Sequence, residues 1–373
     1  MLSIISFNLI GNKKNYMANR FAHLVGSMPF DNEEAAMNNA LDALGGHLHS
    51  LPDGEVGEKS AHYPTGCRSA WTQIIMDSME ADTQNWKVKK RAVRNSIGVP
   101  AHYTKASVLK PKTSPKKIEQ YLNFKWLDYF KSSYPVYKKL KHERGLDHLK
   151  FQVGLPTGLG ITMVVLGPVN GLRYAQAFNR RMAWEANEIA KIADPLDLVF
   201  QIEVPIEVIM FHMMPPLISN IVFGSITGLI KLLNPEIPVG IHLCLGDLNN
   251  ESLAKIKTLK LLVKFANKLV KRLPTTHKLE FMHFPLAEGN VPPVVTASFY
   301  NELKKVKLPP QTRFIAGFVH EKLSLDEHIS LLKNIENIRG ERIEIACSCG
   351  MGRRSEMVAD QLLKIKKTLV EID

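Results

Sequence analysis

Eight short β-rich runs, most of them followed by a helical pattern, constrain the fold of this chain more than any other feature of its sequence. The runs are nearly continuous in apolar residues, which is typical of parallel strands buried on both faces. They cover residues 21–28, 47–54, 149–156, 197–205, 238–246, 279–286, 313–320 and 343–350. Eight alternations of strand and helix predict a (β/α)8 barrel rather than an open doubly wound sheet. No GxGxxG motif follows the first run, which also weakens the dinucleotide-binding alternative.

One long interruption breaks the regular spacing of these runs. The stretch between the second and third runs is basic and rich in Pro and Lys. We expect it to form helices and loops over one mouth of the barrel, as an insertion at about residues 60–147. Residues 20–373 are then a single barrel, and residues 1–19 an N-terminal extension. A chain of 373 residues with 45% hydrophobic and 23% charged residues suits one large globular barrel with an insertion.

The chain carries a net charge of +12, which favours anionic partners such as nucleic acids, membrane surfaces, acidic substrates or acidic carrier proteins. Much of the positive charge lies between Lys87 and Arg144. This segment has neither an aromatic–glycine RNA-binding pattern nor zinc-finger spacing. We therefore expect a solvated basic face and no nucleic-acid partner, with docking of an acidic carrier protein as the alternative.

Two further features bear on location. The four cysteines are too few for a disulfide scaffold, so those that cluster indicate a thiol or metal site in a reducing compartment. Because no convincing secretory signal is present, we expect a cytoplasmic protein.

Residues 206–232 are unusually apolar, but Glu207, His212 and Pro215 interrupt them. We expect a loop and an outer helix there rather than a transmembrane span, with membrane or partner contact as the alternative.

Polar and thiol side chains stand near the carboxyl ends of most of the runs. In a (β/α)8 enzyme the chemistry takes place at that end of the barrel. A buried strand end would otherwise favour apolar residues, because burying a polar group without a partner is costly. The residues are Ser27, Asp53, Glu55, Glu203, His242, Cys244, His283, His320 and Cys349.

A metal site is the sharpest hypothesis that these residues support. His242 and Cys244 are two residues apart, so on a strand both side chains point to the same face. Cys349 arrives from the last run, and His283 or Glu280 from the sixth. Thiolate and imidazole at about four positions are what a tetrahedral zinc ion prefers. Taken alone, the His-x-Cys pair is also compatible with ordinary buried, hydrogen-bonded residues.

Several stretches of the sequence resemble one family of enzymes. They are LVGSMPF, LPDGEVGE, FQVGLPTG, FQIEVP, HLCLGD, MHFPLAEG, GFVHE and CSCGMGRR, which lie between about residues 20 and 355. Together they resemble the catalytic barrel of cobalamin-independent methionine synthases, within the methionine synthase/uroporphyrinogen decarboxylase-like superfamily. The single-barrel methionine synthase-like proteins are the most similar branch.

The resemblance implies roles for individual residues. It places zinc ligands at His242, Cys244 and Cys349, and the family's glutamate ligand near the end of strand six is replaced here by His283 or by Glu280. Ser27 matches the serine that holds the substrate carboxylate. Glu55 matches the carboxylate that binds the α-amino group of the substrate. Glu203 stands where the family has an aspartate that also binds this amino group. His320 matches a histidine linked to proton transfer.

The function implied by the resemblance is metal-dependent methyl or alkyl transfer to a small thiol such as homocysteine, with zinc as the cofactor and another divalent metal as the alternative. The methionine synthases of this family have two barrels, whereas one is expected here, so the methyl donor is either a folate or a corrinoid protein. Two alternatives stay open. One is a metal-free lyase or decarboxylase of the same superfamily, and the other is a non-catalytic barrel that binds a carrier protein or a membrane surface.

Overall fold

A curled parallel sheet forms the centre of the molecule, as shown by a computed structural model that describes residues 20–69, 71–96, 98–215, 219–255 and 257–372. The sheet has seven strands in the order β1–β4–β5–β6–β7–β8–β9, and each neighbouring pair is parallel. The strands are β1 (Ser50–Pro52), β4 (Lys150–Pro156), β5 (Leu198–Glu203), β6 (Val239–His242), β7 (Leu279–Pro285), β8 (Arg313–Val319) and β9 (Glu344–Cys347). These strands confirm seven of the eight predicted runs. The expected extension at residues 1–19 lies outside the described residues.

The first predicted run is much shorter than expected, yet it lies between the two edges of the sheet. Ala22 forms parallel bridges to Leu48, which precedes β1, and to Ile345 in β9. The Ala22 N–H donates to the His47 carbonyl at 2.8 Å, and the His23 N–H donates to the Ile345 carbonyl at 2.8 Å. The expectation of a full strand at 21–28 was therefore wrong in length, because the backbone continues from His23 as irregular chain.

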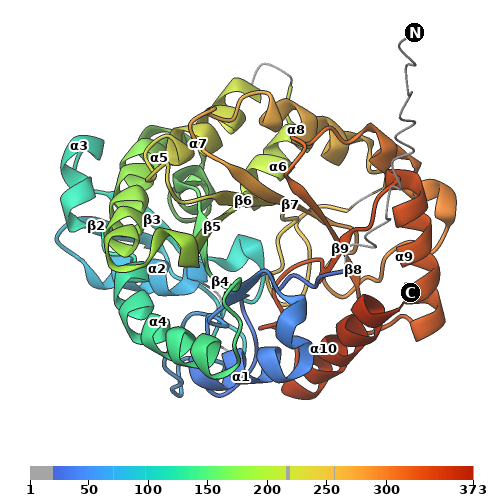
Figure 1. Cartoon of the computed structure of the whole chain (residues 1–373). Helices are drawn as coiled ribbons and strands as arrows, with labels where there is room; N and C mark the ends of the chain where they lie inside the picture. The colour runs from blue at the N-terminus through green and yellow to red at the C-terminus, as the bar shows by residue number, and fades with distance from the viewer. Residues whose placement is uncertain (1–19, 70, 97, 216–218, 256, 373) are drawn as a thin grey trace, which may run out of the picture.

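Helices surround the sheet (Figure 1). Asn32 caps the first of them by accepting from the Ala35 N–H, and Ser324 forms a capping box with Glu327 at the start of another. Their apolar faces pack on the outside of the strands and build the main core. The helices are α1 (Glu33–Leu44), α5 (Gly158–Ile192), α6 (Pro205–Met213), α7 (Ser219–Ile230), α8 (Lys260–Val270), α9 (Leu325–Arg339) and α10 (Glu356–Glu371).

The inner side of the curled sheet is filled in layers. Val199, Phe281, Ile315 and Ala346 form a separate buried apolar cluster. The ring of Phe281 occupies the space beside Gly240, where an added Cβ would lie 2.1 Å from a ring carbon. Two residues further along β7, a buried histidine replaces the apolar side chains. Polar residues thus begin near the carboxyl ends of the strands, and the apolar layer supports them from below.

The apolar stretch 206–232 forms two short helices of the outer ring, α6 and α7. Val208, Val222 and Ile226 are fully buried, and α7 packs against α5. Throughout the described part of the chain, every helix is too short or too polar to cross a bilayer.

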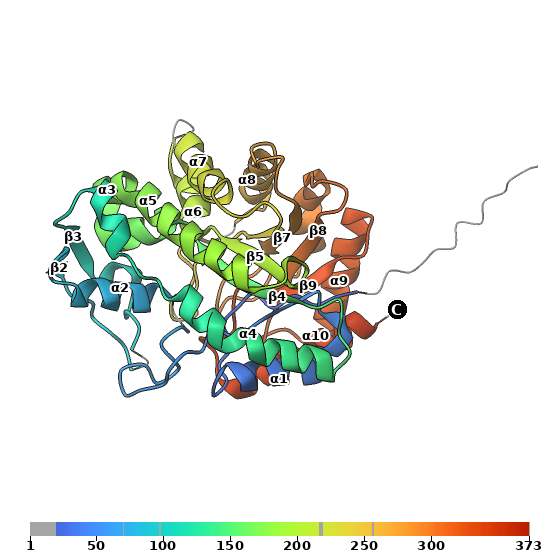
Figure 2. The same cartoon turned by 60° about the vertical axis from the view of Figure 1, so that its left-hand side comes forward.

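The insertion between β1 and β4 contains its own small elements. They are α2 (Trp71–Ala81), the antiparallel pair β2 (Trp86–Lys90) and β3 (Val108–Pro111), α3 (Pro115–Ile118) and α4 (Trp126–Glu143). Helix α4 joins the outer ring by packing on α1 and α5, whereas β2, β3 and α3 lie beyond that ring (Figure 2). Lys87, Lys89 and Lys90 are exposed, in keeping with a solvated basic face.

Candidate metal centre and substrate cavity

Three of the predicted metal ligands meet at the carboxyl ends of β6 and β9. His242 ends β6, Cys244 follows two residues later, and Cys349 lies two residues beyond β9. One ligand atom from each residue lies within 4.8 Å of the others. The two Sγ atoms are 3.8 Å apart. With zinc–sulfur bonds of about 2.3 Å, a tetrahedral ion holds two sulfurs about 3.8 Å apart, so the thiol pair is spaced for such an ion.

His242 supplies a second observation that fits a metal ion. Its Nδ1 atom lies 2.7 Å from Nδ1 of His283. Its Nε2 atom is buried and has no hydrogen-bond partner among the described residues. Buried polar atoms are rarely left unsatisfied, and a bare imidazole nitrogen beside two thiols is a ready zinc donor. The donor set therefore fits a zinc-like cation.

His283 does not join the three-residue cluster. Its Nδ1 faces His242, and its Nε2 lies 3.0 Å from the carbonyl oxygen of Cys347. On the neighbouring strand β8, a Cβ added to Gly317 would lie 2.6 Å from Nε2 of His283, so the absence of a side chain there leaves room for the ring. Glu280, the alternative from the same strand, instead forms ion pairs with Lys150, Lys278 and Arg313. Neither His283 nor Glu280, the two candidates from β7, is therefore placed as a fourth ligand.

Burial controls the protonation of this cluster. Desolvation and the neighbouring His283 hold the pKa of His242 well below its ordinary value, and burial lowers the pKa of His283 to about 3. Both rings are therefore neutral at pH 7, as a metal ligand and its neighbour need to be. The hydrogen bond with Cys244, followed by burial, raises the pKa of Cys349. The thiol of Cys349 therefore stays protonated at neutral pH unless a cation compensates its charge.

An ion pair that the sequence reasoning missed holds the two cysteine-bearing loops together. Arg353 pairs with Asp247 through Nη2 and Oδ2 at 2.9 Å, and the same nitrogen lies 3.6 Å from Sγ of Cys349. Its Nη1 donates to Oγ of Ser27 at 3.1 Å. Both charged residues stand inside motifs already singled out, GMGRR and HLCLGD, and their opposite charges were the available signal.

Ser27 lies against the loop that carries Cys349. Its carbonyl oxygen accepts from the Met351 N–H at 2.6 Å. A Cβ added to Gly350 would lie 2.4 Å from Oγ of Ser27, so this glycine is required by the close approach of the two segments. The structure thus brings Ser27 to the cysteine cluster through Arg353 and Gly350.

Two predicted carboxylates, Glu55 and Glu203, converge on the glycine at the middle of β4. A Cβ on Gly154 would lie 2.9 Å from Oε1 of Glu55 and 3.1 Å from Oε1 of Glu203. Glu55 has a positive φ of 49°, which turns its side chain into this space. Burial and then the negative charge of Glu203 raise the pKa of Glu55 to about 8. A carboxylate pair in this state is a ready partner for an ammonium group, because a shared cation removes the repulsion.

A cavity of about 120 Å³ connects the cysteines with Glu203. Most of its lining is apolar, and much of it comes from the insertion. Residues that line it from the insertion are Met76, Val99, Pro100, Tyr103 and Ala106, and those from the strand ends include Glu203, Cys244, Asp247, Cys349 and Arg353. Residues of the insertion and of the strand ends therefore line the same cavity.

Hydrogen bonds fasten the insertion to the loop after β6. The Tyr103 hydroxyl accepts from the Leu248 N–H at 2.8 Å and donates to the Glu251 carbonyl at 3.2 Å. Asn249 donates through Nδ2 to the Pro100 carbonyl at 2.9 Å, and its Oδ1 accepts from Asn95 at 2.7 Å. Asn249 has a positive φ of 56°. These hydrogen bonds hold the insertion against the loop that carries Asp247 and Leu248, which also line the cavity.

His320 is placed differently from the other predicted site residues. It is fully buried and does not line the cavity. Its Nε2 donates to the Gly289 carbonyl at 2.9 Å, and its Nδ1 accepts from the Lys322 N–H at 3.1 Å. Both ring nitrogens are thus occupied by the backbone, so in this conformation the side chain stabilises a loop.

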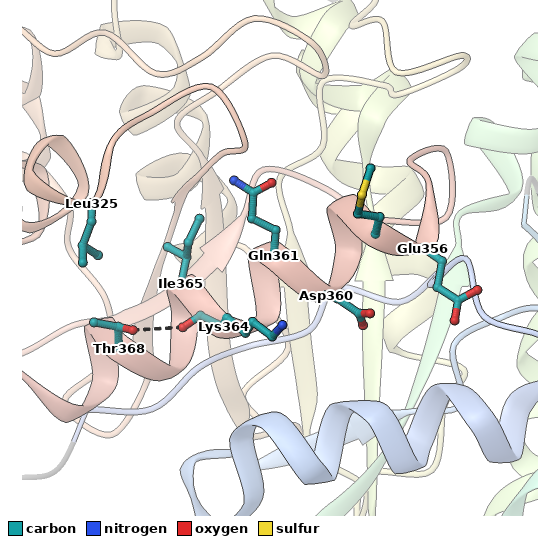
Figure 3. Close-up of a pocket in the computed structure, with 8 residues that line it drawn as sticks. Leu325, Glu356, Asp360, Gln361, Lys364, Ile365 and Thr368 are labelled. Atoms are coloured by element: carbon teal, nitrogen blue, oxygen red, sulfur yellow. Dashed lines mark hydrogen bonds between the residues drawn. The ribbon is translucent and has the colours of Figure 1, made fainter.

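A wider hollow of about 630 Å³ lies on the outer surface along α10 (Figure 3). It is lined by Leu325, Glu356, Met357, Asp360, Gln361, Lys364, Ile365 and Thr368. None of the predicted site residues is among them. This groove is more voluminous than the cavity at the cysteines but has no cluster of convergent thiol and imidazole groups.

Comparisons with known proteins agree with the fold. No protein-family model matches the chain, and no curated protein does. Among solved structures, a B12-independent methionine synthase from Shewanella sp. W3-18-1 in complex with selenomethionine superposes with a TM-score of 0.53 at 13% identity, over 91% of this chain and 87% of that one. XacCel5A matches with a TM-score of only 0.33 at 11% identity, over 62% of this chain and 78% of that one. The chain therefore has a methionine synthase-like fold.

Proposed function

We propose that this protein is a zinc-dependent methyl or alkyl transferase that acts on a small thiol bearing an amino group. The observation that carries the proposal is the donor set: His242, whose buried Nε2 has no hydrogen-bond partner among the described residues, clusters with two sulfurs spaced 3.8 Å apart. The methionine synthase-like fold supports it, since that neighbour is an enzyme. The fold we propose is a (β/α)8 barrel whose first strand is reduced to the bridges at Ala22.

His242, Cys244 and Cys349 would hold the metal ion. Three protein ligands leave one position of a tetrahedral ion for a substrate, which is typical of catalytic rather than structural zinc. A zinc ion held by these three residues would lower the pKa of a substrate thiol at the open position, so that the thiolate is present at neutral pH. Arg353, 3.6 Å from Sγ of Cys349, adds positive charge beside the sulfurs, and Asp247 keeps its guanidinium in place.

The cavity would orient the thiol. Glu203 lines it, and Glu55 lies beside Glu203 at Gly154, so this pair would bind the amino group of the substrate. In the transfer step the sulfur forms a bond to the methyl carbon while the bond from that carbon to the donor breaks. The donor leaves with the electron pair: a folate then takes up a proton on the nitrogen that carried the methyl group, whereas a corrinoid keeps the pair on its cobalt, which is reduced from cobalt(III) to cobalt(I). The apolar walls would exclude water and hold the reactants in line, which is worth several kcal/mol of the barrier.

The donor we propose is a folate or the corrinoid of a carrier protein. A cavity of about 120 Å³ has room for a small thiol but not for either donor in addition. The insertion, held to the loop after β6 through Tyr103 and Asn249, would therefore have to move for a donor to enter.

Metal content of the purified protein tests the proposal. We expect about one zinc ion per chain by elemental mass spectrometry, lost in both His242→Ala and Cys349→Ala. Cys67→Ser is the matched control, because Cys67 contacts Glu58 and Tyr129 instead of the cluster. A protein that binds no metal even after reconstitution with zinc would refute the mechanism and favour a metal-free lyase. If metal is bound, thiols are then screened with methyl donors.

A further inference from the structure

We infer that His283 is a positioning residue for the metal site: it fixes the tautomer of His242 so that the Nε2 lone pair faces the two cysteines. The inference rests on the proposed function, because it concerns how the same site acquires its metal. It differs from the sequence-based expectation, in which His283 was a ligand.

The hydrogen bond between His283 and the Cys347 carbonyl can have only one direction. The Cys347 carbonyl oxygen can only accept a hydrogen bond, so Nε2 of His283, 3.0 Å away, must carry the proton. In a neutral ring the other nitrogen, Nδ1, is then a bare acceptor. The 2.7 Å contact between the two Nδ1 atoms therefore requires the proton to lie on Nδ1 of His242. That leaves Nε2 of His242 unprotonated.

The unprotonated Nε2 of His242 is the atom that a metal ion would bind. Nε2 of His242 is buried and has no hydrogen-bond partner among the described residues. One ring nitrogen of His242 clusters with Cys244 and Cys349, and because Nδ1 is paired with His283, Nε2 is the nitrogen left for a metal ion. With the opposite tautomer, Nε2 would carry a proton and repel a cation, and two bare Nδ1 lone pairs would face each other. A metal-binding histidine is commonly held in its tautomer by a hydrogen bond to its other nitrogen, and here a second histidine makes that bond.

The surroundings of His283 hold it in this orientation. Its position on β7 is in register with His242 on β6. The ring occupies space that a side chain at Gly317 would fill. On its other side lies the ring of His23, with centroids 5.9 Å apart, and Nε2 of His23 is 2.9 Å from Oε1 of Gln201. Both nitrogens of His283 are used within the protein, so this residue cannot act as a ligand without breaking a buried hydrogen bond.

The tautomers can be read directly in metal-free protein. In a long-range ¹H–¹⁵N correlation spectrum of protein labelled with ¹⁵N-histidine, we expect His242 to carry its proton on Nδ1 and His283 on Nε2. Signals are assigned from His242→Ala and His23→Ala as well as from the His283 variants. A proton on Nε2 of His242, or on Nδ1 of His283, would overturn the inference. Because no metal is present, this outcome is independent of whether the proposed transferase activity exists.

Two substitutions then separate positioning from ligation. Glutamine at this position still offers a hydrogen-bond acceptor and a hydrogen-bond donor, whereas the methionine side chain has no donor and only a weak sulfur acceptor. We expect His283→Met to weaken zinc binding about 10–100-fold, and His283→Gln to restore most of that loss. The Co²⁺-substituted protein should keep its ligand-field spectrum in His283→Gln. Equal losses in both variants, with a changed Co²⁺ spectrum, would identify His283 as a direct ligand and refute the positioning role, and unchanged zinc affinity in His283→Met would refute it as well.

Discussion

Replacing Glu55 with Gln is predicted to stabilise the protein increasingly as the pH rises. The Glu55 carboxyl lies beside Gly154 and Glu203. Burial and the charge of Glu203 raise its pKa from an ordinary value of 4.5 to about 8. The folded state therefore retains a proton that the unfolded chain has already lost. Stability from this proton is complete below the unfolded pKa and is lost as the pH rises through the folded value.

The size of the effect follows from linkage. Between about pH 4.5 and pH 8 the wild type should lose about 1.4 kcal/mol per pH unit through this single group, or about 5 kcal/mol over the whole window. Glutamine does not titrate, so Glu55→Gln should match the wild type near pH 4.5 and exceed its free energy of unfolding by several kcal/mol at pH 8. Glu203→Gln should reduce the effect, because it removes the second cause of the raised pKa.

Urea unfolding at intervals of half a pH unit would measure this difference. The difference between variant and wild type isolates Glu55 from other titrating groups, such as Glu207, whose pKa burial raises to about 7. Glu34→Gln on the exposed side of α1 is the control for replacing a surface carboxylate with an amide. A pH-independent difference for Glu55→Gln would refute the reasoning, since it would mean that Glu55 is ionised in the folded protein at neutral pH.

Two further substitutions test the packing of the site. Gly350→Ala places a Cβ 2.4 Å from Oγ of Ser27 and should lower the free energy of unfolding by about 1–3 kcal/mol. Gly224→Ala on α7, where a Cβ meets open space, should be neutral or stabilising, and equal effects in thermal unfolding would contradict the close approach. His320→Ala removes two hydrogen bonds to backbone and should cost about 1–3 kcal/mol while leaving zinc stoichiometry unchanged; loss of the metal in a folded variant would show that His320 contributes to the cluster.

The strands were predictable because their apolar runs have a strong physical cause. β5, for example, is almost entirely buried. Because both faces of such a strand pack against other residues, it needs a nearly continuous run of apolar side chains. The run at 21–28 is also mostly apolar, but only Ala22 forms bridges to strands on both sides. Local sequence does not record where neighbouring backbones diverge, so the length of that strand could not be predicted.

The candidate site was predictable in its residues and not in their contacts. The spacing of His242 and Cys244 follows from strand geometry, so their shared face could be inferred. Whether His283 binds a metal or a neighbouring histidine depends on a carbonyl in β9, which is distant in sequence. Arg353 and Asp247 were overlooked because a charged residue after a strand usually faces solvent, and their pairing across the site depends on the closure of the sheet.

The bridges at Ala22 also set the order in which the molecule can be completed during synthesis. Ser27 and Arg353 are 326 residues apart, and the segment around Ala22 must wait for β9 before both of its edges are paired. The two sulfurs of the cluster come from residues 105 positions apart. The donor set is therefore complete only after β9 has joined the sheet, and tight zinc binding would serve as a marker that a nascent molecule has closed the sheet correctly.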